Sequence, residues 1–178
     1  DVGLRGDFEA QITKGGSITL NAKKLFDIVR ELPDADVHLT EERDQWIRLR
    51  CERSDFRFPG LPPSDFPSLP DVEGVEPHSV SAKVLENMIR KTMFSISTDE
   101  TRYTYNGVFM ESDGDILRLV ATDGHRLAMI EEKCPGMKLK EGVIVHRKAL
   151  GELVKILPEA EGDVNIFVKE NHIIFRIR

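Results

Sequence analysis

Apolar residues recur three and four positions apart in three stretches of the chain, a spacing that predicts amphipathic helices. These stretches are residues 22–32, 82–94 and 146–157. Asn21 and Ser81 precede the first two stretches, and both residue types favour the N-cap position of a helix. Each predicted helix therefore has one face for a core and one face for solvent.

Between the helices, apolar and polar residues alternate over short stretches, which is the pattern of strands with one buried face. Trp46, Arg48 and Arg50, for example, alternate with apolar neighbours. Asp113-Gly114 and Asp123-Gly124 are typical of tight turns between paired strands. The predicted strands are 2–5, 8–13, 17–20, 36–41, 45–51, 54–58, 78–80, 102–112, 115–121, 126–132, 141–145, 164–169 and 172–178.

Six of the nine prolines fall between residues 59 and 77, which predicts a connection between two domains. Proline has no backbone N–H group and restricts the residue before it, so this segment cannot form a continuous strand. The sequence on the two sides is internally repeated: residues 21–33 return without a gap at 146–158, each followed by an acidic turn and two alternating strands. Four identical residues mark the repeat: Leu25, Val29, Leu32 and Pro33 return as Leu150, Val154, Leu157 and Pro158.

The order of elements predicts an α+β fold made of repeated βαβββ units. We expect residues 1–70 to be the C-terminal part of one domain. We expect residues 71–178 to be a second domain without its final strand.

Composition limits the function classes. Apolar residues make up 40% of the 178 residues, charged residues 31%, and the formal net charge is −6. The charge argues against a protein that coats nucleic acid with its whole surface, but it allows a local basic face. No 18-residue apolar run or signal sequence is present, so we expect a cytoplasmic protein without a membrane span. Cys51 and Cys134 are expected to be buried, reduced thiols rather than a disulfide or a metal site.

The three helices expose cations although the chain is acidic. Helical geometry places these cations off the apolar stripes. They are Lys23, Lys24, Arg30, Lys83, Arg90, Lys91, Arg147, Lys148 and Lys155. One interpretation is that mixed charges simply solvate the helices. The other is that the helices share one side and attract phosphates without reading bases.

The segment 117–130 predicts a hairpin with a polar tip, for which two interpretations stay open. Asp123 and His125 could form an acid–base pair of a small hydrolase, with Thr122 as nucleophile. However, the sequence has no nucleophile elbow, zinc-protease helix or phosphate-binding loop, and its histidines lack ligand spacing. Alternatively, His125 and Arg126 beside Leu127 could rim an apolar pocket for a partner peptide, including in a module that binds only proteins.

Four blocks of sequence carry a resemblance to a known family. They are Ala22-Lys-Lys-Leu-Phe-Asp-Ile-Val-Arg30, Leu61-Pro-Pro-Ser-Asp-Phe-Pro-Ser-Leu69, Arg102-Tyr-Thr-Tyr-Asn-Gly-Val108 and Leu119-Val-Ala-Thr-Asp-Gly-His-Arg-Leu-Ala128. In order and spacing, the chain resembles the bacterial sliding clamps, the beta subunits of the replicative DNA polymerase. The resemblance implies a ring-shaped homodimer with three domains per subunit, helices around duplex DNA and sheets outside. It also implies a non-catalytic tether for the polymerase, placed on DNA by an ATP-using clamp loader, without a metal or cofactor.

The resemblance also assigns residues. Lys23, Lys24, Arg30, Arg147 and Lys148 would face DNA. Helical geometry adds Lys83, Arg90 and Lys91, and Tyr103 is expected near DNA. The partner-peptide pocket would use Arg102, Tyr105, Thr122, Gly124, His125, Arg126 and Leu127, and it would serve the polymerase and other proteins that carry a clamp-binding motif. Tyr105 stands where the family often has leucine, and the family's third domain is absent from this sequence.

Overall fold

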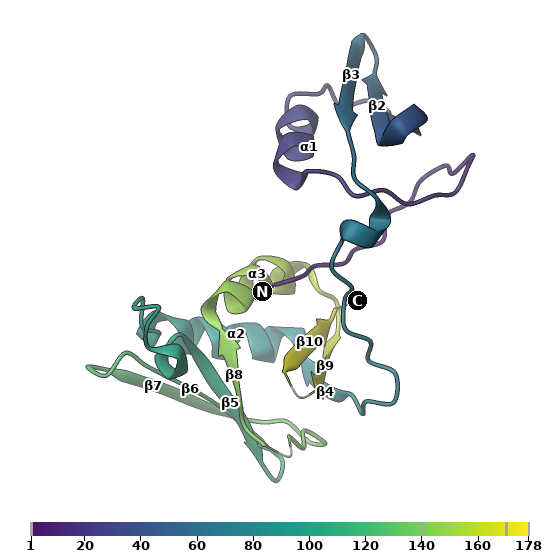
Figure 1. Cartoon of the computed structure of the whole chain (residues 1–178). Helices are drawn as coiled ribbons and strands as arrows, with labels where there is room; N and C mark the ends of the chain where they lie inside the picture. Colours follow the sequence, from purple (N-terminus) through teal and green to yellow (C-terminus); the bar gives the residue numbers. More distant parts are fainter. Residues whose placement is uncertain (1, 140, 170, 178) are drawn as a thin grey trace. The chain divides into compact units, whose positions relative to one another are not determined.

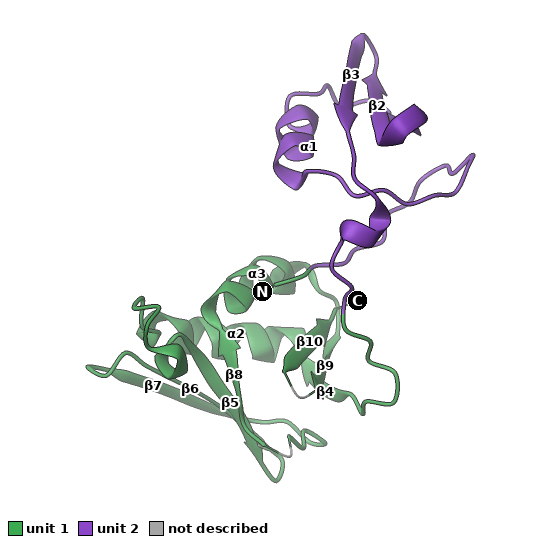
Figure 2. Cartoon of the chain, viewed as in Figure 1, with its two compact units in different colours: residues 1–3, 70–178 green, residues 4–69 purple. Residues whose placement is uncertain are grey.

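The computed structural model of the chain describes residues 2–139, 141–169 and 171–177 (Figure 1). The chain divides into two compact units, shown in Figure 2. Unit 2 is Leu4–Leu69, and unit 1 comprises Asp1–Gly3 and Pro70–Arg178. The division falls within the proline-rich stretch of the sequence.

Unit 2 is one helix packed on a three-stranded antiparallel sheet. The strands β1 (His38–Glu41), β2 (Trp46–Cys51) and β3 (Ser54–Pro59) lie in the order β1-β2-β3. Helix α1 (Ala22–Val29) begins at Asn21, whose side chain accepts a hydrogen bond from the backbone N–H of Lys24. A small core of Ile47, Leu49 and Phe58 lies against the apolar side of α1.

Two predictions for the first 32 residues are wrong. The stretches 2–5, 8–13 and 17–20 form no strands; only Thr19 makes an isolated bridge, with Leu61. Alternating residues become a strand only where a neighbouring strand accepts their hydrogen bonds, and Phe8 is here 93% exposed. Helix α1 also ends at Val29 rather than at residue 32, because the chain tightens into three-residue turns before Pro33.

The described residues of unit 1 form two α-helices and two antiparallel sheets. Its first half is β4 (His78–Ser81), α2 (Ala82–Thr92), β5 (Gly107–Asp113), β6 (Ile116–Thr122) and β7 (Leu127–Lys133). Its second half is β8 (Val143–His146), α3 (Arg147–Ile156), β9 (Asp163–Lys169) and β10 (His172–Arg176). The sheets have the orders β7-β6-β5-β8 and β10-β9-β4, so each sheet joins strands of both halves. This α+β arrangement of repeated units is the fold predicted from the sequence.

The predicted strand 102–112 begins too early, and the predicted helix 82–94 ends too late. Residues Tyr103–Tyr105 form a 3-10 turn, and the ladder of β5 starts only at Gly107. The backbone N–H of Ser97 donates to the carbonyl of Tyr105, which holds this segment in a loop. The last turn after Thr92 is likewise a 3-10 helix, Met93–Ser95. Arg102 and Tyr105 therefore lie on a loop that precedes the sheet.

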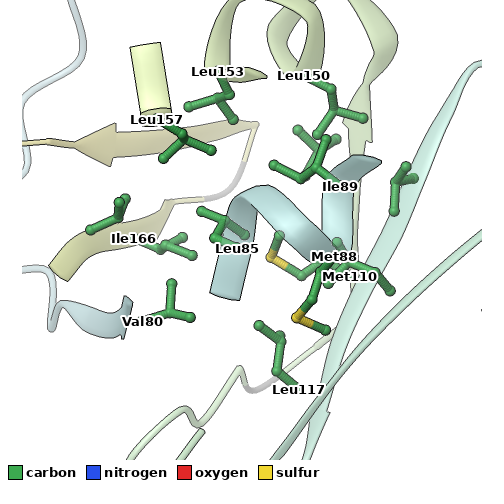
Figure 3. Close-up of a cluster of buried hydrophobic side chains, with 14 of the residues drawn as sticks. Val80, Leu85, Met88, Ile89, Met110, Leu117, Leu150, Leu153, Leu157 and Ile166 are labelled. Atoms are coloured by element: carbon green, nitrogen blue, oxygen red, sulfur yellow. The ribbon is translucent and has the colours of Figure 1, made fainter. Parts of the chain in front are cut away.

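Both helices of unit 1 cover the same face of the β7-β6-β5-β8 sheet. Leu85, Met88 and Ile89 of α2 and Leu150 and Leu153 of α3 enter one buried cluster with the inward side chains of the sheets (Figure 3). The two helices also contact each other. Their polar faces therefore point away from this shared core.

The repeated helix is covered differently in the two units. Leu150, Leu153 and Leu157 of unit 1 are 0%, 5% and 1% exposed. The equivalent residues of unit 2, Leu25, Ile28 and Leu32, are only half-buried, and Val29 is 45% exposed. Unit 2, all of whose residues are described, contains no second α-helix against α1, whereas α2 lies beside α3.

Cys51 and Cys134 are buried free thiols, one in each unit. No helix among the described residues is long and apolar enough to cross a membrane.

Candidate functional site

All predicted helix cations lie on the solvent side of their helices, and ion pairs divide them into two sets. Arg90 pairs with Glu86 at 2.7 Å, Arg30 with Glu31 at 3.2 Å, and Lys155 with Glu152 at 2.8 Å. Arg147 is partly buried and lies 3.8 Å from Glu100. Exposed pairs of this kind leave little net positive field around the paired cation.

The other set comprises lysines without a carboxylate within 4.0 Å among the described residues. They are Lys23, Lys24, Lys83, Lys91 and Lys148, and all five are exposed. Lys83 and Lys91 extend from α2, and Lys148 extends from the first turn of α3, so the outward faces of both helices of unit 1 carry uncompensated positive charge. Tyr103, on the loop before β5, adds an aromatic ring that is 84% exposed.

The tip of the β6–β7 hairpin is held by Asp123. Its carboxylate accepts hydrogen bonds from the backbone N–H groups of His125 and Arg126, both at 3.0 Å, and from Nε of Arg126 at 3.0 Å. The two backbone hydrogen bonds lower the pKa of Asp123 most, to about 2, and the Arg126 side chain adds to the effect. Thr122 Oγ1 donates to the carbonyl of Arg126 at 2.7 Å and accepts from the N–H of Gly124 at 3.1 Å.

This geometry does not assemble the acid–base pair of the hydrolase hypothesis. Asp123 is ionised and bonded to the backbone of His125, and no described residue hydrogen-bonds the His125 imidazole. The Thr122 hydroxyl donates to a backbone carbonyl, so it is not poised as a nucleophile. The polar groups at the tip shape a turn.

The same turn meets the loop before β5. A Cβ atom added at Gly124, whose φ is +90°, would lie 3.5 Å from Nη1 of Arg102 and 3.9 Å from Cε2 of Tyr105. Four of the seven predicted pocket residues, namely Arg102, Tyr105, Thr122 and Gly124, are thus brought together. Tyr105 and Thr122 also line an open hollow of about 430 Å³.

The other three predicted pocket residues, His125, Arg126 and Leu127, are exposed on the same turn. The Leu127 side chain is 64% exposed, so this end of β7 presents an apolar group to solvent. The guanidinium of Arg126 lies 5.8 Å from the centre of the Phe94 ring. Nothing in the sequence distinguishes Phe94, because an apolar residue at the end of a helix usually packs into the core, whereas Phe94 is 58% exposed.

Within residues 2–139, 141–169 and 171–177, no group of three or more His, Cys, Asp or Glu side chains could hold a metal ion.

Two family models match the chain. The model of the DNA polymerase III beta subunit central domain matches residues 79–178, and that of the N-terminal domain matches residues 1–70. Among curated relatives, a protein named beta sliding clamp from Vibrio cholerae is 39% identical over 181 residues, covering 98% of this chain and 48% of the relative. A beta sliding clamp from Staphylococcus aureus is 34% identical, covering 97% and 46%. The chain spans about half the length of the curated relatives it matches.

Solved structures give the same result. A sliding clamp of Bartonella birtlesii bound to griselimycin has a TM-score of 0.86 and 41% identity, covering 96% of this chain and 47% of that one. A beta sliding clamp of Caulobacter crescentus has a TM-score of 0.87 and 38% identity, covering 94% and 46%.

Proposed function

Because the chain belongs to the DNA polymerase III beta subunit family, the bacterial sliding clamps, we propose that it functions in a clamp that encircles duplex DNA. In this role it tethers the replicative polymerase and makes synthesis processive. It works by enclosure rather than by catalysis, in the cytoplasm, as part of a ring-shaped homodimer that a clamp loader opens and places on DNA.

The observation that carries this proposal is the distribution of free charge. On a chain of net charge −6, five helix lysines have no carboxylate partner among the described residues. Lysines of this kind attract phosphates without sequence preference, while the acidic remainder keeps binding weak and salt-sensitive. We propose that the DNA-facing set is Lys23, Lys24, Arg30, Lys83, Arg90, Lys91, Tyr103, Arg147 and Lys148.

The second part of the proposal is a partner pocket at the 122–127 turn. Arg102 and Tyr105 approach Gly124, and Leu127 supplies an exposed apolar surface. We propose that a short linear motif with apolar anchors binds here, carried by the polymerase or by other clamp-binding proteins. The griselimycin complex of the Bartonella clamp is consistent with a ligand-binding function in this family.

Two triple variants test the DNA interface. Each loses three positive charges, one on the helices and the other elsewhere on unit 1. Lys83→Gln, Lys91→Gln and Lys148→Gln combined should make the negative slope of log K against log salt shallower by about 2.7, since each phosphate contact contributes about −0.9. The control combines Lys133→Gln, Lys138→Gln and Lys169→Gln, which lie outside the helices and are also exposed. Fluorescence anisotropy with a labelled duplex at low salt gives both slopes.

If the charge acts locally, the control leaves the slope unchanged. Equal loss in both triple variants would show that only net charge matters, and the helix interface would be wrong. Circular dichroism of both variants checks that the fold is retained.

A further inference from the structure

The face of the β7-β6-β5-β8 sheet opposite the helices carries an apolar row that the proposed DNA contacts do not use. The strand registers pair Met129 with Val120, Val120 with Phe109, and Phe109 with Ile144. These four side chains, one from each strand, are here called the apolar band. Met129 is 58% and Ile144 44% exposed, and the other two are half-buried.

An ion-paired row borders the apolar band on one side. Arg118 donates from Nε to Glu131 Oε1 and from Nη1 to Glu111 Oε1, both at 2.6 Å. Both carboxylates raise the pKa of Arg118. One arginine between two glutamates leaves this row with a net charge of −1, and the Oε2 atoms accept no hydrogen bond from any described residue. The row can therefore accept a further cation.

The other side of the band opens into the candidate pocket. Gly107 lies at this end of the face, where β8 approaches so closely that a Cβ atom would lie 2.4 Å from the backbone oxygen of Val145. An open hollow of about 430 Å³ on this face connects the two surfaces. It is lined by Phe109, Val120 and Met129 of the band, by the ion-paired row, and by Tyr105 and Thr122 of the pocket. A peptide anchored at the 122–127 turn would find continuous apolar surface leading to the acidic row.

We propose that the apolar band and the row Glu111–Arg118–Glu131 extend the partner pocket. The occupant is a flanking segment of the same partner peptide: an apolar side chain lies on the band, and the Lys or Arg that follows it binds Glu131. This inference rests on the proposed partner pocket, and it adds a preference for basic flanking residues. Burial of the apolar peptide side chain on the band supplies affinity, and the net negative charge of the row favours peptides with a basic residue at this position.

Three synthetic peptides test the extension on the 178-residue chain. The first holds a Leu-Phe anchor alone, the second adds Leu-Lys, and the third adds Leu-Glu, with the additions made at either end of the anchor. Calorimetry should show about tenfold tighter binding of the Leu-Lys peptide than of the anchor, from partial burial of one leucine and one new charge contact. In methyl NMR spectra, this peptide should shift the signals of Met129 and Ile144 in addition to that of Leu127.

Glu131→Lys should abolish the preference of Lys over Glu in the peptide, while Glu161→Lys, an exposed carboxylate of unit 1 outside this face, should leave it unchanged. Shifts at Leu127 without shifts at Met129 and Ile144 would overturn the extension and leave the pocket standing. An absence of shifts with all peptides would overturn the pocket and the extension together. Shifts of Met129 that follow protein concentration without peptide would mean that a second copy covers the band, and would overturn the proposal.

Discussion

Leu150 and Leu25 occupy the same position of the internal repeat, and the structure predicts that they differ in what they contribute to stability. Leu150 on α3 is 0% exposed because α2 and the β7-β6-β5-β8 sheet both pack against α3. Leu25 on α1 is half-buried, with one sheet beneath it and no second helix beside it in unit 2. Replacing each leucine by alanine removes the same atoms from two different environments.

The magnitudes follow from burial. Leucine to alanine removes about three buried carbons, at about 0.8 kcal/mol each, and a closed site adds a cavity term. Leu150→Ala should therefore lower the free energy of unfolding of unit 1 by about 3–5 kcal/mol. Leu25→Ala should lower that of unit 2 by about 1–1.5 kcal/mol, because only part of the side chain leaves contact and no closed cavity forms.

The chain contains convenient probes for each unit. The single tryptophan, Trp46, lies in unit 2, so its fluorescence during urea unfolding follows that unit. Amide hydrogen exchange at Leu117 and Leu119, which are fully buried, follows unit 1. Equal costs for the two substitutions, or a larger cost for Leu25→Ala, would refute the argument that the neighbouring helix makes the difference.

Two further predictions concern the turn and the glycines. The pKa of Asp123 is depressed to about 2, so its carboxylate stabilises the turn fully at pH values above the usual pKa of an aspartate, and this stabilisation is lost as pH falls towards 2. The amide chemical shifts of His125 and Arg126 should therefore titrate in this range, and Asp123→Asn should remove the titration. Gly151→Ala should stabilise α3 by about 0.5–1 kcal/mol, since open space surrounds the added methyl group. Gly107→Ala should instead destabilise unit 1 by about 1–3 kcal/mol, since its Cβ would lie 2.4 Å from a backbone oxygen of β8. Thermal unfolding of both variants tests these two predictions.

Residue periodicity predicted the elements whose partners lie in the described chain. The apolar stripes of all three helices and the hairpins after Asp113 and Asp123 are confirmed, with shifted ends. The strands predicted at 2–5, 8–13 and 17–20 have the same kind of alternation as β2, yet no strand pairs with them. Alternation specifies which side chains share a face, but hydrogen-bonding partners decide whether a strand forms.

The sequence likewise predicts only part of the candidate site. Helical spacing was enough to place all the cations on solvent faces. Spacing allows the local pairs of Arg90 with Glu86 and of Lys155 with Glu152, but it could not predict that Arg147 pairs with Glu100, which lies on a loop far away in sequence. Nor could spacing bring Arg102 to Gly124, since both belong to irregular segments whose meeting depends on the whole sheet.

The apolar band shows how sequence and structure together locate a surface. In a sheet that helices cover on one side only, outward residues are expected to be polar. In β5, β6 and β7, the row of Glu111, Arg118 and Glu131 follows this rule. The adjacent row of Phe109, Val120 and Met129 breaks it, although the registers place it on the same open face. An apolar row on this open face costs solvation without adding to the core, so it is better explained by a ligand that covers it than by folding.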